Sequence, residues 1–517
     1  MERGLKPGVL LLSVALIWAL ESFCVQLMSF GFDYPVPMKK WVGAQVIRFL
    51  LDAAFATGCV FLLPRRVTTA FFIVFAAFAQ VAVYYKAMFG RALTLTTMRA
   101  QWTEGLASAQ FDWAYLNIPL LLTMLTTLAL KIWLLALARR SDVRTPAMRR
   151  TGAAAWTVYA LIAITAMLLI DSPRKLRSFV TSDRLGMTYG FVFLWASEAV
   201  VLNQEQLLRE AVENRVNTTD RLSAIEPPLT PTGDVVLIQV ESLDWRVLNH
   251  HVGGKPVMPF LNRLADEAML FKITAIRLNG SGDTDFIMLN AVPPSPSVMT
   301  YTLANYPYTD TLPQIAQRAG YATAAFHGNG GQFFSRARAF KHMGFDELWF
   351  QEELRDKGGL PESLWGIRDD VFLAFARTRL HEGRKTQRQL HFLITLTSHQ
   401  PFTYIEPSER LFLPKADTLL DRYLDSMNFL DRHLEKYVDG LAPGTLIIIF
   451  GDHRAPVTFN NTANGESTAE HVPLIIHRVG EKLATQQASR TLPITQSGDL
   501  TTLDAASYIH RLFKKSP

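Results

Sequence analysis

The chain has 517 residues, of which 49% are hydrophobic and 19% are charged, and its formal net charge is +6 at pH 7. This length is too great for a single hydrophobic core, so two or more domains are expected. The basic residues form no stripe suited to nucleic acid, and Cys24 and Cys59 are the only cysteines, which excludes a disulfide framework and a thiolate metal site.

Nearly all of the long apolar runs lie in the first 171 residues. Five of them are long enough to cross the hydrocarbon core of a bilayer, at about 8–30, 41–63, 67–88, 112–138 and 152–171. No small-residue cleavage site ends the first run and four more follow it, which argues against a cleaved signal peptide. The sequence therefore predicts a five-helix transmembrane domain over residues 1–171.

Some of these runs contain charged side chains, which are costly inside a membrane. Arg48 and Asp52 are one helical turn apart and could pair with each other, or they could contact a lipid headgroup. Glu21 and Lys131 are expected to face neighbouring helices or to reach toward the membrane surface.

The basic residues of the short loops predict the orientation, because cytoplasmic loops carry an excess of Lys and Arg. One set of loops holds Arg3, Lys6, Arg65, Arg66, Arg139, Arg140, Arg144, Arg149 and Arg150, and the other holds Lys39, Lys40, Arg91 and Arg99. The first set is the larger, so the N-terminus is expected inside. An odd number of crossings then predicts a multi-pass protein of the plasma (inner) membrane with residues 172–517 on the extracytoplasmic, or periplasmic, side.

Residues 172–229 are expected to join the membrane domain to the rest of the chain as an interfacial helix and linker. LGMTYGFVFLWASEAVVL (185–202) is an apolar amphipathic run, and a charged helical stretch follows it. The Pro-rich EPPLTPTGD (226–234) is typical of a domain boundary. The alternative, a sixth span at 185–202, is disfavoured because it would return the C-terminal domain to the cytoplasm.

Strand and helix patterns alternate along residues 230–517. Short continuous apolar runs predict buried strands, at VVLIQV (235–240), LHFLITLTS (390–398), GTLIIIFGDH (444–453) and VPLIIH (472–477). Helical spacing occurs at 258–271 and 417–440, and 311–327 predicts a helix followed by a strand. This alternation indicates an α/β fold with a largely parallel sheet, in which ligands gather at the carboxyl ends of the strands.

Polar side chains follow four of these strands at that edge. Glu241, His327 and His399 each come at or after the end of a strand, and Asp452 and His453 follow another. Glu241, Asp452 and His453 form an oxygen-rich set with one imidazole, which suits Mn²⁺ or Mg²⁺, with Zn²⁺ also possible. Strand-end Asp and His residues also serve as caps, so the pattern as a whole carries more weight than any one residue.

LNGSGDTDF (278–286) places Ser281 between two glycines. Gly, Ser and Asp are turn formers, so a surface turn is one interpretation. The other is that Ser281 is the fourth metal ligand, because a hydroxyl bound to a cation loses its proton more easily and becomes a competent nucleophile.

Several motifs occur in an order that resembles lipoteichoic acid synthase-type phosphoglycerol transferases of the alkaline phosphatase and sulfatase superfamily. They are VVLIQVESLDW, MPFLNRLADEAMLF, GSGDTDF, TLPQIAQRAGYATAAFHGN, FFSRARAFKHMGFDELW, WGIRDD, ITLTSHQPF and IIIFGDH. The resemblance covers about 230–510 by motif. It implies an N-terminal α-helical membrane domain and an exported C-terminal α/β alkaline phosphatase-like domain over 230–517. The sulfatase nucleophile pattern Cys-x-Pro-x-Arg is absent, which argues against a formylglycine sulfatase.

The resemblance also implies residue roles. Glu241, Ser281, Asp452 and His453 would hold one divalent metal, commonly Mn²⁺ in the family, with Ser281 standing where the family usually has threonine. His327, Arg336 and His399 match residues that contact the phosphate and the glycerol headgroup. Phe334 stands where the family usually has tryptophan, which alters the wall of the headgroup pocket.

These roles agree with the chemistry of the side chains. Arg336 can hold a phosphate with its planar guanidinium, and His399 can act as a general acid or base near neutral pH. The alternatives are that His327 caps a strand end and that Arg336 is a surface residue near a helix start. Trp365 of WGIRDD is expected in the core, and Asp369 and Asp370 are expected to begin a helix.

The sequence therefore predicts a membrane-anchored phosphoglycerol transferase. Ser281 would take the headgroup of phosphatidylglycerol and pass it to a glycan or glycerol-phosphate acceptor. Phosphatidylethanolamine is the alternative donor, although lipid A phosphoethanolamine transferases usually carry several disulfides in a domain that has no cysteine here. A phosphodiesterase or phosphatase, and an inactive lipid-sensing scaffold, are the alternatives from other classes.

Overall fold

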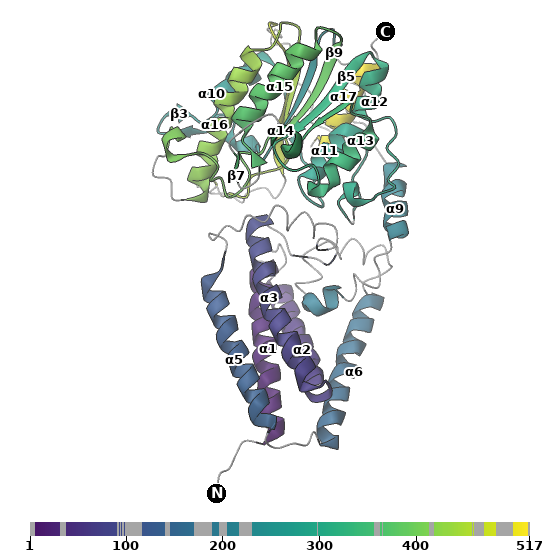
Figure 1. Cartoon of the computed structure of the whole chain (residues 1–517), viewed down its shortest axis with the longest axis vertical. Helices are drawn as coiled ribbons and strands as arrows, with labels where there is room; N and C mark the ends of the chain where they lie inside the picture. Colours follow the sequence, from purple (N-terminus) through teal and green to yellow (C-terminus); the bar gives the residue numbers. More distant parts are fainter. Residues whose placement is uncertain are drawn as a thin grey trace. The chain divides into compact units, whose positions relative to one another are not determined.

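The computed structural model of the chain is shown in Figure 1. It describes residues 6–30, 38–89, 93, 95, 98, 116–139, 145–169, 189–195, 204–216, 230–296, 298–355, 362–363, 366–412, 418–457, 459, 470–481 and 500–514. The helices before Asn203 belong to one compact unit, and the chain from Gln204 onward belongs to a second. Trp365 and most of the predicted linker 172–229 lie outside the described residues; the described parts of the linker include a helical segment, 189–195, and α9 (Gln204–Glu213).

The N-terminal unit consists of long helices. They are α1 (Pro7–Phe30), α2 (Met38–Leu62), α3 (Arg65–Phe89), α5 (Ile118–Arg139) and α6 (Pro146–Leu169). Among the described residues, four helices are long and apolar enough to cross a membrane, namely α1, α2, α3 and α5. Helix α6 covers much of the predicted fifth crossing, and the number of crossings stays a prediction.

Polar contacts link neighbouring helices of the N-terminal unit. Lys131 of α5 forms an ion pair with Glu21 of α1, and both side chains are buried. The amide of Gln26 on α1 donates a hydrogen bond of 2.7 Å to the Asp52 carboxylate on α2. Lys131, Glu21 and Asp52 therefore each have a polar partner on a neighbouring helix, as an apolar surrounding requires.

The C-terminal unit contains a seven-stranded sheet in the order β4-β11-β10-β1-β9-β5-β6. Its strands are β1 (Val235–Val240), β4 (Met269–Thr274), β5 (Tyr321–His327), β6 (Glu347–Trp349), β9 (Arg388–Ile394), β10 (Leu446–Gly451) and β11 (His471–Arg478). Strands β10, β1, β9, β5 and β6 run parallel to one another, and β11 runs antiparallel between β10 and β4. The largely parallel sheet is confirmed, and all six residues of β1 are buried, as its continuous apolar run predicts.

Helices cover both faces of this sheet (Figure 1). One face carries α10 (Pro259–Glu267), α15 (Asp369–Gly383) and α16 (Leu419–Asp439), whose apolar residues form one core with the sheet. The other carries α11 (Gly282–Asn290), α12 (Leu312–Arg318), α13 (Arg336–Met343) and α17 (Thr502–Lys514). Smaller elements are α14 (Gln351–Arg355) and two hairpins, β2–β3 (His251–Val252, Lys255–Pro256) and β7–β8 (Glu362–Ser363, Gly366–Ile367).

The helical spacing predicted over 258–271 is wrong at its C-terminal end. Helix α10 ends at Glu267, and Met269 already begins β4. In this strand Phe271 and Ile273 are buried while Lys272 is exposed, which is the period of two of a strand. Pairing with β11 outweighs the helical pattern of the preceding residues.

Asp431 of α16 supplies the cap that α10 lacks. The N-cap residue Met258 makes no side-chain cap, and the Asp431 carboxylate accepts hydrogen bonds of 2.8 Å from the backbone N–H groups of Phe260 and Leu261. We expect Asp431→Ala to lower the free energy of unfolding by about 2 kcal/mol, because two buried N–H groups lose their acceptor. Thermal unfolding of the full chain measures this, with Asp439→Ala at the exposed end of α16 as the control. Equal stabilities of the two variants would contradict the capping role.

Candidate active site

Four parallel strands place their carboxyl ends at one edge of the sheet. Glu241 directly follows β1, and Asp452 and His453 follow β10, whose last residue pairs with the last residue of β1. His327 ends β5 opposite Ile394 of β9. The strand-end pattern of the sequence therefore corresponds to a real convergence of side chains.

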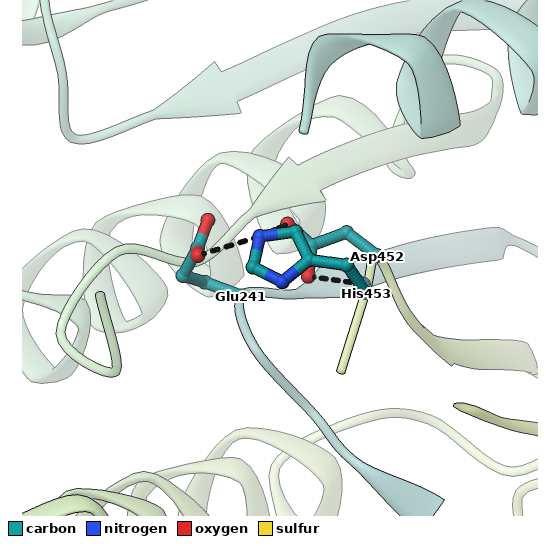
Figure 2. Close-up of side chains that lie close together, drawn as sticks. All are labelled: Glu241, Asp452 and His453. Carbon is teal, nitrogen blue, oxygen red and sulfur yellow. Dashed lines mark hydrogen bonds and ion pairs between the residues drawn. The ribbon is translucent and has the colours of Figure 1, made fainter. Parts of the chain in front are cut away.

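Glu241, Asp452 and His453 form a buried cluster, shown in Figure 2. One ligand atom from each residue lies within 4.8 Å of the others. His453 Nε2 lies 3.2 Å from Glu241 Oε1 and 3.5 Å from Asp452 Oδ2, so the imidazole points toward both carboxylates.

Hydrogen bonds outside the cluster orient its ligand atoms inward. His453 Nδ1–H donates to the carbonyl of Arg454 (3.0 Å), which leaves the Nε2 lone pair for the cluster. Asp452 Oδ1 accepts from the N–H groups of Ser242 (2.8 Å) and His453 (2.7 Å). Asp452 Oδ2 accepts no hydrogen bond within the described residues. A buried carboxylate oxygen without a donor, beside a second carboxylate and an imidazole, fits a divalent cation such as Mn²⁺, Mg²⁺ or Zn²⁺.

The electrostatics of the cluster also favour a cation. Burial raises the pKa of Glu241, but the charges of His399 and His453 outweigh it and hold this pKa below its usual value. Burial and the neighbouring Glu241 raise the pKa of Asp452 well above its usual value. Burial lowers the pKa of His453, and the charge of Arg277 lowers it further. The carboxylates of Asp452 and Glu241 outweigh both effects and raise this pKa to about 9. The cluster is thus stabilised by added positive charge.

Sequence reasoning missed the residues that fix the turn carrying Glu241. The backbone N–H of Glu241 donates to Thr395 Oγ1 (2.9 Å), and Ser398 Oγ donates to its carbonyl (2.6 Å). Ser242 has a φ of 56°, and its carbonyl accepts a hydrogen bond from the Tyr423 hydroxyl (2.9 Å). The only sequence signal was the Thr and Ser in ITLTSHQPF, which are compatible with many other roles.

We expect Thr395→Val to weaken metal binding by about 10-fold to 100-fold, because the buried N–H of Glu241 loses its acceptor and the carboxylate is no longer held in place. Thr395→Ser keeps the oxygen and is the matched control. Titration of Mn²⁺ by calorimetry measures the effect. An unchanged affinity in the valine variant would show that Thr395 does not position Glu241.

Ser281 lies at the N-cap position of α11, with its side chain half-buried. The Asp283 carboxylate accepts from the N–H groups of Leu278 (2.7 Å) and Asn279 (2.5 Å), which folds the preceding turn back onto the helix. Thr284 Oγ1 donates to the Asp452 carbonyl (2.8 Å) and ties the first turn of α11 to the end of β10. The motif therefore begins a helix that is attached to the metal-site strand.

Phe334 and Arg336 lie beside the start of α11. A Cβ on Gly282 would come within 3.0 Å of the Met299 side chain and 3.2 Å of the Phe334 ring, so the start of α11 packs closely against both. Phe334 is buried, although its φ of 57° is unusual for a bulky side chain. The Arg336 guanidinium lies 5.2 Å from the centroid of the same ring, and its Nε donates to Asp285 Oδ2 (2.8 Å). Arg336 is 2% exposed, so its interpretation as a surface residue is wrong.

The two other predicted histidines occupy the same edge. His327 is buried and its Nδ1–H donates to the carbonyl of Ile394 (2.9 Å), which leaves Nε2 for a ligand. Burial and the charge of Arg336 lower the pKa of His327 to about 3, so this imidazole is neutral. His399 is half-buried in the loop after β9. That loop is fixed by Asp369, the first residue of α15, which accepts from the N–H groups of Leu396 and Thr397 at 2.8 Å each.

A largely parallel sheet with a carboxylate–histidine cluster at its strand ends defines an alkaline phosphatase-like α/β protein with a candidate metal site. The sulfatase family model matches residues 233–502, more than half of the chain, and the chain belongs to this family. The relatives with which it aligns include lipoteichoic acid synthases.

Two such relatives give the extent of this similarity. The lipoteichoic acid synthase of Staphylococcus saprophyticus is 29% identical over 232 residues, which cover 43% of this chain and 35% of the relative. That of Staphylococcus aureus is 28% identical over 253 residues, covering 46% and 38%. The chain thus aligns with little more than a third of the length of these relatives.

A solved structure has a fold similar to that of most of the chain. The integral membrane protein lipooligosaccharide phosphoethanolamine transferase A from Neisseria meningitidis has a TM-score of 0.53 at 15% sequence identity. The match covers 91% of this chain and 88% of that one. This likeness agrees with a fold that has an N-terminal helical part and a C-terminal α/β part.

Proposed function

We propose that the chain is a membrane-anchored, metal-dependent transferase that moves a phosphoglycerol headgroup from phosphatidylglycerol to a glycan or glycerol-phosphate acceptor. The observation that carries the proposal is the hydrogen bond from Thr284 to Asp452, which ties the first turn of α11, the helix that begins at Ser281, to the candidate metal cluster. The similarity to lipoteichoic acid synthases supports the class of reaction.

The proposed domain limits are residues 1–171 for five crossings, 172–229 for the interfacial helix and linker, and 230–517 for the exported catalytic domain. A catalytic domain tethered to the membrane faces a raised effective concentration of a lipid substrate. The four apolar helices among the described residues support such an anchor.

In the proposed reaction, the deprotonated Ser281 oxygen attacks the phosphorus of the donor and the bond to the diacylglycerol oxygen breaks. His399 gives a proton to this leaving oxygen, and Ser281 then carries the headgroup phosphate. The acceptor hydroxyl attacks the same phosphorus and gives its proton to His399, and the bond to Ser281 breaks. Arg336 and the neutral His327 hold the phosphoryl oxygens throughout.

Glu241, Ser281, Asp452 and His453 would hold the divalent cation, for which we propose Mn²⁺. When bound, the cation supplies positive charge that favours a deprotonated serine and the anionic phosphoryl oxygens. The hydrogen bonds of Ser242 and Arg454 to the cluster keep its ligand atoms in place before the cation arrives.

Phosphatidylethanolamine is the second candidate donor, because Phe334 replaces the tryptophan that is usual in the phosphoglycerol transferases that the sequence resembles. The Phe334 ring lies against both Gly282 and Arg336, so it borders the space in which the headgroup would lie.

Donor use is tested by incubating the full chain in mixed micelles with Mn²⁺ and either lipid, with and without an acceptor, and measuring diacylglycerol and free headgroup phosphate. Diacylglycerol release from phosphatidylglycerol that rises with an acceptor supports the proposal. Diacylglycerol release from phosphatidylethanolamine and not from phosphatidylglycerol would show that phosphatidylethanolamine is the donor. Free glycerol phosphate that forms equally fast without an acceptor would identify a hydrolase, and intact lipids would favour a scaffold.

A further inference from the structure

Arg277 is a second arginine at the metal-site edge of the sheet, and the reaction proposed above does not use it. Strand β4 is antiparallel to β11, which is antiparallel to β10, so β4 runs in the direction of β10. The carboxyl end of β4 therefore lies at the same edge as Asp452 and His453. Arg277 is in the connection that leads from this end to Ser281.

The backbone around Arg277 is held on both sides. Before it, the N–H of Ala275 donates to the Glu470 carbonyl (2.8 Å), and that of Ile276 donates to Thr502 Oγ1 (3.2 Å). After it, Asp283 binds the N–H groups of Leu278 and Asn279. The arginine thus projects from a fixed segment rather than from a free loop.

Glu470 occupies only one edge of the Arg277 guanidinium. Nε and Nη2 both donate to Glu470 Oε1, at 3.2 Å and 2.7 Å. No hydrogen bond from Nη1 to another described residue occurs, and 35% of the arginine side chain is exposed. A guanidinium has five N–H groups, so the end formed by Nη1 and Nη2 keeps donors for a second, bidentate partner.

The charge of Arg277 reaches the cluster. It opposes protonation of His453. Desolvation lowers the pKa of Arg277, but Glu470 raises it most strongly, and the carboxylates of Asp452 and Glu241 add smaller contributions in the same direction. Arg336 shows the same arrangement, with one carboxylate, Asp285, on its Nε. Two arginines, each held by a carboxylate, thus lie on segments that follow strands ending at the edge of the sheet that carries the cluster.

We infer that Arg277 binds the anionic oxygens of the phosphate group that reacts at Ser281, with the end of its guanidinium that Glu470 leaves open. The site already contains the carboxylates of Glu241 and Asp452, so a phosphate that enters it needs further cations nearby. The inference deepens the proposed function and rests on it for the identity of the phosphate. Glu470 is a positioning residue, because it fixes the plane of the guanidinium.

The alternative is an ordinary surface ion pair, which contributes little to stability and nothing to binding. The pair of Arg263 and Glu435 provides a matched control in the same unit. Its atoms lie 2.5 Å apart and its side chains are 56% and 38% exposed. Removing the charge of Arg277 or of Arg263 is expected to leave the melting temperature almost unchanged. A measurement of phosphate binding is therefore needed to distinguish a phosphate-binding arginine from a surface ion pair.

The experiment uses the full chain with Ser281→Ala, which prevents turnover, and adds Arg277→Gln, Arg277→Lys or Arg263→Gln. Calorimetry measures the affinity for inorganic phosphate and for sn-glycerol 1-phosphate in the presence of Mn²⁺, and the affinity for Mn²⁺ alone. We expect Arg277→Gln to weaken both phosphate ligands by about 10-fold to 100-fold without weakening Mn²⁺ binding. Arg277→Lys should bind phosphate more tightly than Arg277→Gln but less tightly than the original, because lysine keeps the positive charge but lacks the planar guanidinium that can bind two oxygens.

Phosphate affinities of Arg277→Gln that equal those of Arg263→Gln would overturn the inference. A loss for glycerol phosphate alone would also overturn it, since the contact would then be to glycerol. The binding readout needs no turnover, so a phosphate site at Arg277 remains measurable even if Ser281 proves not to be a nucleophile.

Discussion

Ser281→Ala is expected to abolish headgroup transfer, with a loss of about 10³-fold or more in kcat, because the variant lacks the oxygen that attacks the phosphorus. The N-cap serine makes no side-chain cap to α11, so its removal should leave the fold intact. Metal binding should persist in part, since Glu241, Asp452 and His453 remain. Release of diacylglycerol from phosphatidylglycerol by the full chain measures the loss.

Ser281→Thr is the matched control for this variant. Threonine keeps the hydroxyl and is the residue that the resembled family usually has there, so transfer should continue within about 10-fold of the original rate. Turnover by the alanine variant at the rate of the threonine variant would mean that Ser281 only forms a turn.

Asp452→Asn is expected to abolish metal binding, lowering the affinity for Mn²⁺ by more than about 100-fold. Loss of a residue that only hydrogen-bonds to a metal ligand already lowers metal affinity by about 10-fold to 100-fold, and Asp452 is itself a proposed ligand. The amide keeps an Oδ1 that accepts from Ser242 and His453, while the charge at Oδ2 disappears. Burial and Glu241 penalise the charged form of Asp452, so the metal-free variant should melt no lower than the metal-free original.

Thermal unfolding with and without Mn²⁺ tests both parts of this prediction. A cation that binds only the folded state raises the melting temperature of the original chain, and the variant should show no such rise. Asp439→Asn, on an exposed residue of α16, should respond to Mn²⁺ as the original does. A Mn²⁺-induced rise in the Asp452→Asn variant would place the metal elsewhere.

Much of the fold was predictable from the sequence because its signals are local. The apolar runs of β1 and β10 are buried strands, and α16 ends at Asp439, just before the Gly440 that predicts its end. Strand β4 was missed because it begins at the residue after the C-cap of α10, and its first three residues continue the apolar pattern of that helix. The partner that makes it a strand, β11, is about 200 residues away in the chain.

The candidate site was predictable where residues follow strands, since parallel strands end at one edge. This explains why Glu241, Asp452 and His453 could be named together before their distances were known. Thr395 and Arg277 could not be found in this way. Thr395 acts through a hydrogen bond to the backbone of Glu241, and Arg277 reaches the site from β4, the strand that the sequence did not predict.

The most direct test of the account is the intact mass of the full chain after incubation with Mn²⁺ and phosphatidylglycerol in the absence of an acceptor. A parallel arm uses phosphatidylethanolamine, and Ser281→Ala is the control in both. The account predicts a mass increase that matches glycerol phosphate in the original chain and no increase in the variant. An unmodified chain with unchanged lipids, or an adduct that persists in Ser281→Ala, would contradict a covalent transfer through Ser281.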